Sequence, residues 1–199
     1  MLRRLFAVLL ALVIALVVIG FMLPASVVIE RDRSFDRSPE LLFEVLSDLR
    51  HFTRWSPWLD GEDEGRFRLE GPASGVGTTM VWREGSEAAT SRMRITALEA
   101  PQRIDFDLEF GDNDAEGWFL IEPDGQSDSG AQRVRWGLAM QFGALDLVGR
   151  YVGLMLPGLI GGEYERGLEQ LAEYLGQAPG RVPELPADLD GEWLDRGQR

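Results

Sequence analysis

Residues 151–175 read YVGLMLPGLIGGEYERGLEQLAEYL, a sequence in which two different kinds of helix follow one another. The second half places apolar side chains at helical spacing, with acidic residues on the opposite face. This apolar stripe comprises Tyr164, Leu168, Leu171, Ala172 and Leu175. The first half is apolar on nearly every side, and Pro157 and the glycines should kink or interrupt it. Residues 151–175 therefore predict a long, broken helix that lies across another layer of the domain.

The chain before this helix predicts a series of strands joined by turns. Strands are expected at residues 27–34, 66–70, 78–82, 88–98, 103–110, 117–122 and 133–142. The strand at 103–110 alternates apolar and acidic residues, which is typical of a strand with one wet face. Residues 117–122 are apolar on both sides, so the sequence does not assign their inward face. Consecutive strands predict an antiparallel meander rather than a doubly wound parallel sheet.

A helix and a shorter turn follow the first strand. Ser38 is a typical N-cap, and Pro39 suits the first position of a helix. The helix should end near Asp48, and residues 51–55 should form the turn. The order of elements is then a strand, this helix pair, six strands and the long helix. This order predicts an α+β domain in which the C-terminal helix lies across a curved antiparallel sheet, with a cavity between them.

Residues 5–23 form an uninterrupted apolar run of 19 residues, preceded by Arg3 and Arg4. At about 1.5 Å per residue the run reaches roughly 28 Å, close to the hydrocarbon thickness of a bilayer. The competing interpretation is a cleaved signal peptide, whose apolar region is usually shorter and ends at a small-x-small site. Leu23 stands where that site needs a small residue, which favours an uncleaved transmembrane anchor. Because residues 24–29 are uncharged, we expect the N-terminus in the cytoplasm and the domain outside it.

The composition excludes several kinds of function. The 199-residue chain has a formal net charge of −13, so it should repel nucleic acid, and no such partner is expected. It has no cysteine, which excludes disulfides, thiolate metal sites and cysteine nucleophiles. His51 is the single histidine, so we expect no metal site. No catalytic set or cofactor motif is recognisable, and residues 178–199 predict a disordered acidic tail.

Five short segments resemble, in this order, the START/polyketide-cyclase-like superfamily, whose helix-grip fold is also called SRPBCC. They are FDRSP (35–39), FTRWSPW (52–58), GP (71–72) with GVGT (75–78), FLIEP (119–123) and GEYERGLEQL (162–171). The resemblance covers about residues 27–175. It implies a seven-stranded antiparallel sheet wrapped around the long C-terminal helix, with an apolar pocket between them. Members of the superfamily bind lipids, sterols and polyketides, and some are cyclases or aromatases.

Large apolar side chains are the candidates for lining such a pocket. Small-molecule sites are mostly apolar with few polar groups, and an indole N–H can orient a polar head group. The predicted ligand-binding residues are Trp55, Trp58, Trp82, Phe106, Trp136, Met140, Tyr151 and Met155. The alternative is that these aromatic rings simply fill the core. His51 would be a general base if it faced the pocket, whereas the plainer interpretation packs it at the end of the first helix or leaves it in solvent.

Three functions are compatible with these features, and we favour the first. It is a membrane-anchored protein that holds a hydrophobic small molecule or lipid without catalysis. Residues 1–26 would be the transmembrane anchor in the inner (cytoplasmic) membrane, and residues 27–177 the helix-grip domain. The second is a cyclase or dehydratase acting on a hydrophobic, polyketide-like substrate, with His51 or a pocket tyrosine as base. The third is a structural or interaction protein of the cell envelope that recruits a partner through its tail.

Overall fold

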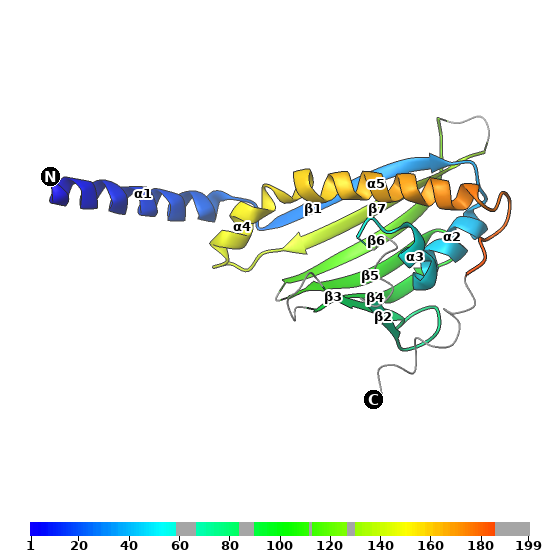
Figure 1. Ribbon diagram of the computed structural model, residues 1–199. Coiled ribbons are helices and arrows are strands. Elements are labelled where there is room, and N and C mark those ends of the chain that lie inside the picture. The colour runs from blue at the N-terminus through cyan, green and yellow to red at the C-terminus, as the bar shows by residue number, and fades with distance from the viewer. Residues whose placement is uncertain (59–66, 84–89, 112, 127–129, 186–199) are drawn as a thin grey trace.

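The computed structural model describes residues 1–58, 67–83, 90–111, 113–126 and 130–185 (Figure 1). The helices in these ranges are α1 (Leu2–Met22), α2 (Pro39–Ser47), α3 (Leu49–Trp55), α4 (Leu147–Gly153) and α5 (Leu156–Gly176). The strands are β1 (Ser26–Phe35), β2 (Phe67–Glu70), β3 (Thr79–Arg83), β4 (Thr90–Glu99), β5 (Arg103–Phe110), β6 (Asn113–Pro123) and β7 (Gln132–Gln141).

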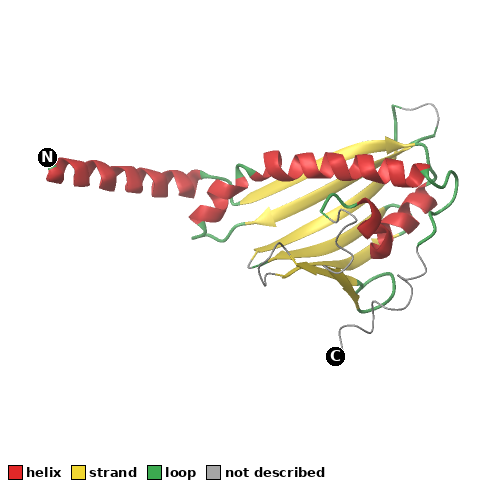
Figure 2. Ribbon diagram, in the orientation of Figure 1, coloured by secondary structure: helices red, strands yellow, loops and turns green. Residues whose placement is uncertain are grey.

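The strands form an antiparallel sheet that carries the remaining elements. Over the described residues, seven strands lie in the order β1-β7-β6-β5-β4-β3-β2, each antiparallel to its neighbours. β1 pairs with the last strand, β7, from Ser26 opposite Gln141 to Phe35 opposite Gln132. The helices α2, α3 and α5 lie over one face of this sheet, while α1 extends from one end (Figure 2). This arrangement confirms the predicted α+β helix-grip fold, with a seven-stranded antiparallel sheet and a long C-terminal helix.

β6 differs most from its predicted range, and its faces are now assigned. It begins at Asn113, four residues before the predicted start, because polar residues there continue the pairing with β5. Phe119 and Ile121 point into the core, whereas Trp118 is half-buried on the outer face. Trp118 lies against Gly137 of β7, where a Cβ would meet the indole at 2.1 Å. The outward tryptophan is therefore accommodated by a glycine on the neighbouring strand.

The helix pair after β1 begins as predicted but contains a second helix in place of the turn. The Ser38 hydroxyl accepts a hydrogen bond from Leu41 N at 3.3 Å, and Pro39 lies in the first turn of α2. Asp48 ends α2 and also caps α3, because its carboxylate accepts a hydrogen bond from Arg50 N at 2.9 Å. One residue thus ends one helix and starts the next, so no loop separates them.

The C-terminal helix is broken, as predicted, but the break precedes Pro157. α4 ends at Gly153 and α5 begins at Leu156, so Pro157 lies in the first turn of α5. Proline is tolerated there because the first N–H groups of a helix have no acceptor within it. The helix then continues to Gly176 through the glycine pair that follows Ile160.

An aromatic cluster joins α5 to the centre of the sheet. Tyr164 on α5 stacks on Trp136 of β7, with ring centroids 4.1 Å apart and an interplanar angle of 9°. Trp55 of α3 and Phe119 of β6 pack against the same indole, with ring centroids 5.4 and 5.2 Å from that of Trp136. All four side chains are almost completely buried. Gly167 permits this close approach, because a Cβ at that position would meet the Trp136 ring at 2.7 Å.

Two glycines of α5 provide a matched test of this contact. A Cβ at Gly162 would meet nothing within 4 Å, so Gly162→Ala should stabilise the domain by about 1 kcal/mol through helix propensity. Gly167→Ala gains the same propensity but overpacks the Trp136 contact, so it should destabilise by roughly 1–3 kcal/mol. Denaturant unfolding followed by circular dichroism measures both effects. Equal stabilisation by the two substitutions would contradict the close approach of α5 to the sheet.

Candidate functional site

An apolar cleft of about 430 Å³ lies at the end of the domain where α4 meets α5. One wall comes from the helices and the other from the ends of three strands and the segment that follows β7. The lining residues are Phe110, Asn113, Met140, Phe142, Asp146, Val148, Gly149, Val152, Leu156 and Ile160. The cleft therefore lies under the broken part of the C-terminal helix, where the sequence is apolar on every side.

The strand register brings the sheet side of the cleft together. Phe110 ends β5 and lies opposite Asn113 at the start of β6, and Met140 is on the adjacent part of β7. Asp146 also reaches the cleft, but its carboxylate caps α4 by accepting a hydrogen bond from Gly149 N at 2.8 Å. Asn113 is thus the lining side chain that can both donate and accept. Such a site suits an apolar ligand with a small polar end.

Four of the predicted ligand-binding residues lie in or around this cleft. Met140 lines it. Tyr151 is on α4, where its hydroxyl donates a hydrogen bond to Leu16 O of α1 at 2.8 Å, and Met155 is exposed between α4 and α5. Trp82 on β3 is half-buried, with its ring centroid 6.2 Å from that of Phe110, which lines the cleft. Ligand contact by these four side chains remains a prediction.

The other four predicted residues lie at the centre of the domain. Trp55 and Trp136 belong to the buried aromatic cluster, and the buried Phe106 packs against its member Phe119 with ring centroids 5.2 Å apart. Trp58 is partly exposed and packs edge-on against Trp136 and Tyr164, at centroid distances of 5.5 and 5.8 Å. Side chains thus occupy the space beneath the middle of α5. A role in ligand binding for these four residues also remains a prediction.

Several residues that line the cleft were not among the predicted ligand-binding residues. Val148, Val152, Leu156 and Ile160 share one wall of it. Their helical spacing was a usable signal, but the sequence around them is apolar in every direction, so periodicity could not show which side faces inward. Phe142 was assigned to the last strand, whereas β7 ends at Gln141 and Phe142 lies beyond it.

The cleft lies beside the end of α1. Among the described residues, α1 alone is long and apolar enough to cross a membrane, judged by length and composition. The residues of α1 are exposed except for Gly20, which is buried where α1 meets α4. A Cβ at Gly20 would lie 3.3 Å from both Leu147 and Tyr151. The N-terminal helix and the helical wall of the cleft are therefore in direct contact.

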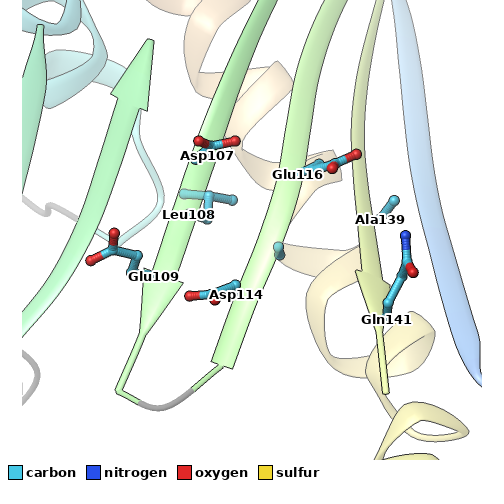
Figure 3. A pocket seen from close by; sticks show the side chains of 8 residues that line it. Asp107, Leu108, Glu109, Asp114, Glu116, Ala139 and Gln141 are labelled. Carbon is cyan, nitrogen blue, oxygen red and sulfur yellow. The ribbon is translucent and has the colours of Figure 1, made fainter. Parts of the chain in front are cut away.

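A second depression, of about 380 Å³, lies on the sheet face turned away from α5 (Figure 3). Its side chains include Asp107, Glu109, Asp114 and Glu116 from the outward positions of β5 and β6. Within the ranges that the structure describes, no group of three or more histidine, aspartate or glutamate side chains is placed to hold a metal ion. These carboxylates form a solvated acidic face.

His51 lies near the opposite end of the domain from the apolar cleft, in a polar depression of about 480 Å³. The histidine is buried on α3, and its Nδ1 is 2.7 Å from the Tyr174 hydroxyl near the end of α5. Burial lowers the pKa of His51, although the nearby Asp48 carboxylate acts in the opposite direction. The histidine therefore favours its neutral form, which can accept a hydrogen bond from Tyr174.

The first segment of the predicted tail also lies at this depression, because Pro183 and Glu184 line it. Residues 186–199 of the predicted tail lie outside the described residues.

Comparison with known proteins gives one family match. Residues 26–176 match the family described as polyketide cyclase / dehydrase and lipid transport. No curated protein sequence shows significant similarity to this chain. The match covers the sheet and all helices except α1.

Several solved structures share the fold at low sequence identity. Norcoclaurine synthase from Thalictrum flavum, solved with dopamine and hydroxybenzaldehyde, is 12% identical with a TM-score of 0.57, over 82% of this chain and 94% of that one. A protein from Thermobifida fusca is 15% identical with a TM-score of 0.53, over 79% and 98%. Ginseng major latex-like protein 151 from Panax ginseng is 11% identical with a TM-score of 0.51, over 76% and 98%. At these identities the likeness concerns the fold alone.

The buried histidine predicts a specific dependence of stability on pH. Because the pKa of His51 is lowered in the folded state, the unfolded chain binds the proton more readily as pH falls below about 6.5. The free energy of unfolding should therefore decrease from pH 7 towards pH 5, and His51→Gln should show a smaller decrease. Denaturant unfolding of both proteins at several pH values measures the difference. The contribution of the carboxylates cancels in this comparison, because they titrate in both proteins. Parallel pH profiles would show that His51 has no such role.

Proposed function

The chain belongs to the polyketide cyclase / dehydrase and lipid transport family, and from this membership we propose that it is a membrane-anchored protein that binds a hydrophobic small molecule or lipid. The ligand would occupy the cleft between the sheet and the α4–α5 segment, and no chemical step is assigned to it. The family and the fold support binding of a hydrophobic ligand in general. The identification of this particular cleft rests on its geometry.

The observation that carries the proposal is the apolar cleft itself. Its volume of about 430 Å³ falls within the usual range of roughly 300–1,000 Å³ for small-molecule sites. The lining is almost entirely aliphatic or aromatic, and Asn113 provides a polar side chain at one end. A related fold holds small aromatic molecules, because norcoclaurine synthase was solved with dopamine and hydroxybenzaldehyde.

Residues 1–26 are proposed as an uncleaved anchor in the inner membrane, with the domain outside the cytoplasm. The contacts of α1 favour an anchor over a removable signal sequence. Tyr151 donates to Leu16 O, and the Arg150 guanidinium donates to Phe21 O and Leu23 O at 3.5 and 3.3 Å. Those last two carbonyls lie at the end of α1, where helical acceptors have no partner within the helix. Removal of α1 would leave Tyr151 and Arg150 without these acceptors.

A cyclase or dehydratase is the second candidate, and one observation favours it. His51 and Tyr174 form a buried hydrogen-bonded pair of the kind that can move a proton. However, Tyr174 and the cleft residue Ile160 are 14 positions apart on α5, which corresponds to about 21 Å. The proton-transfer pair and the apolar cleft are therefore at different ends of the helix. A ligand confined to the cleft would not reach His51, so we rank this candidate below binding alone.

Native mass spectrometry of the full chain released from detergent micelles tests the proposed ligand site. The wild-type protein should carry an apolar adduct of defined mass. Ile160→Trp fills the cleft from α5 and should reduce the adduct several-fold, as should Val152→Trp from α4. Leu159→Trp is the matched control, because Leu159 is the neighbouring residue but is exposed and does not line the cleft. An absent adduct, or equal occupancy in all four proteins, would refute the ligand site.

The anchor is tested by the mass of the chain isolated from membranes. An uncleaved anchor gives the full-length mass and a protein that resists extraction at alkaline pH. A mass that lacks residues up to Ala25 or Ser26 would instead identify residues 1–26 as a signal peptide. The two outcomes differ by the mass of the whole N-terminal segment, so the measurement distinguishes them without a control variant.

A further inference from the structure

The apolar surface around α4 has no covering element within the described parts of the chain. After α1, six of the nine large apolar side chains described as exposed lie between residues 145 and 159. They are Leu145, Val148, Val152, Leu154, Met155 and Leu159. Residues 147–162 also contain a single charged side chain, Arg150. Such a concentration of exposed apolar side chains identifies a contact surface.

The overlap between α1 and α4 identifies what this surface contacts. Tyr151 Oη reaches Leu16 O, Leu147 and Tyr151 lie against Gly20, and Arg150 reaches the carbonyl of Phe21, so side chains of α4 contact α1 from Leu16 to its end. Residues 2–15 alone would span only about 21 Å, and Arg3 and Arg4 shorten the apolar part further. A bilayer needs about 30 Å of apolar helix, so the part of α1 beside α4 must lie within the membrane as well.

We propose that α4 and the first turn of α5 are seated in the membrane that α1 enters, so that the apolar cleft opens sideways into lipid. This inference rests on the proposed anchor and ligand site and names the ligand class: a membrane-dissolved amphiphile with an alkyl chain. The overlapping segment of α1, from Leu16 to Met22, corresponds to about 10 Å. That depth matches the roughly 5–10 Å to which interfacial helices bury their apolar faces.

The hydrogen bonds made by Arg150 and Tyr151 are compatible with such a position. Arg150 directs its guanidinium to the carbonyl oxygens of Phe21, Leu23 and Ala144. The bonds to Phe21 and Leu23 satisfy acceptors at the end of α1 that would otherwise be unpaired near the hydrocarbon. A cation beside the C-terminal end of a helix is also favoured by the helix dipole. Tyr151 places an amphipathic ring at the same level, as tyrosines commonly do at membrane interfaces.

The exposed apolar side chains on and after α4 then have two different roles. Leu154 and Leu159 are exposed and do not line the cleft, so they would contact acyl chains. Val148 and Val152 are exposed and also line the cleft, so they lie at its opening. An alkyl chain that moves from the bilayer past these two valines would enter the cleft without crossing water. The helix is interrupted between Gly153 and Leu156. The helical wall of the cleft therefore lacks continuous helical hydrogen bonding.

Site-specific labelling tests the inference directly, because the chain has no cysteine. Single variants Leu154→Cys, Val152→Cys and Val76→Cys would be labelled with bimane and reconstituted as full chains in phosphatidylcholine vesicles. Val76 is the control, since it is exposed in the turn between β2 and β3, away from α1. Lipids brominated on their acyl chains should quench the labels at Leu154 and Val152 several-fold more strongly than the label at Val76. Aqueous iodide should show the opposite order.

Each alternative outcome has a distinct meaning. Equal iodide quenching at all three positions would overturn the membrane seating of α4. Lipid quenching at Leu154 but not at Val152 would overturn the sideways opening of the cleft. Flotation of the same vesicles and the adduct measured by native mass spectrometry report on the proposed function separately. A protein that floats and carries the adduct, yet shows no lipid quenching at Leu154, would disprove this inference alone.

Discussion

The contact between Tyr164 and Trp136 determines how the remaining parts of the domain are arranged. The stacked rings hold α5 against the centre of the sheet, and Gly167 allows the two layers to approach. Trp55 and Phe119 then complete a buried aromatic cluster. Because this cluster occupies the middle of the interior, open apolar space is found at the end where α4 and the first turn of α5 replace the regular helix. The position of the cleft therefore follows from the close packing of the centre.

Most of the fold was accessible from the sequence because its signals are local. Alternating residues fixed β5, the Ser38 cap fixed the start of α2, and the order of elements fixed an antiparallel sheet with a C-terminal helix. The errors occurred where local patterns conflict with long-range packing. Asn113, Asp114 and Glu116 are polar, yet residues 113–116 extend β6 through pairing with β5, and Asp48 caps a helix where a turn was expected. Pro157 lies in the first turn of a helix that it was expected to kink or interrupt.

The site was harder to predict than the fold. The sequence pointed to large aromatic residues as candidates for lining a pocket, but it could not distinguish a filled core from an open pocket. That distinction depends on packing distances such as the 4.1 Å between Trp136 and Tyr164. Of the eight predicted ligand-binding residues, Met140 is the one that lines the cleft. The residues of the helical wall, Val148, Val152, Leu156 and Ile160, lie in a segment that is apolar on nearly all sides, where periodicity carries no directional information.

The pairing of β1 with β7 has a consequence for how the protein is made. Val27 pairs with Met140, so more than half of the chain must be synthesised before the first strand gains its partner. Until then β1 has unpaired backbone groups directly after α1, which is a hazard for aggregation. α5, which packs along β1, is synthesised later still. The nascent chain therefore cannot complete its sheet during translation of the early strands, and a ribosome that stalls before residue 132 would release a polypeptide whose first strand has no native neighbour.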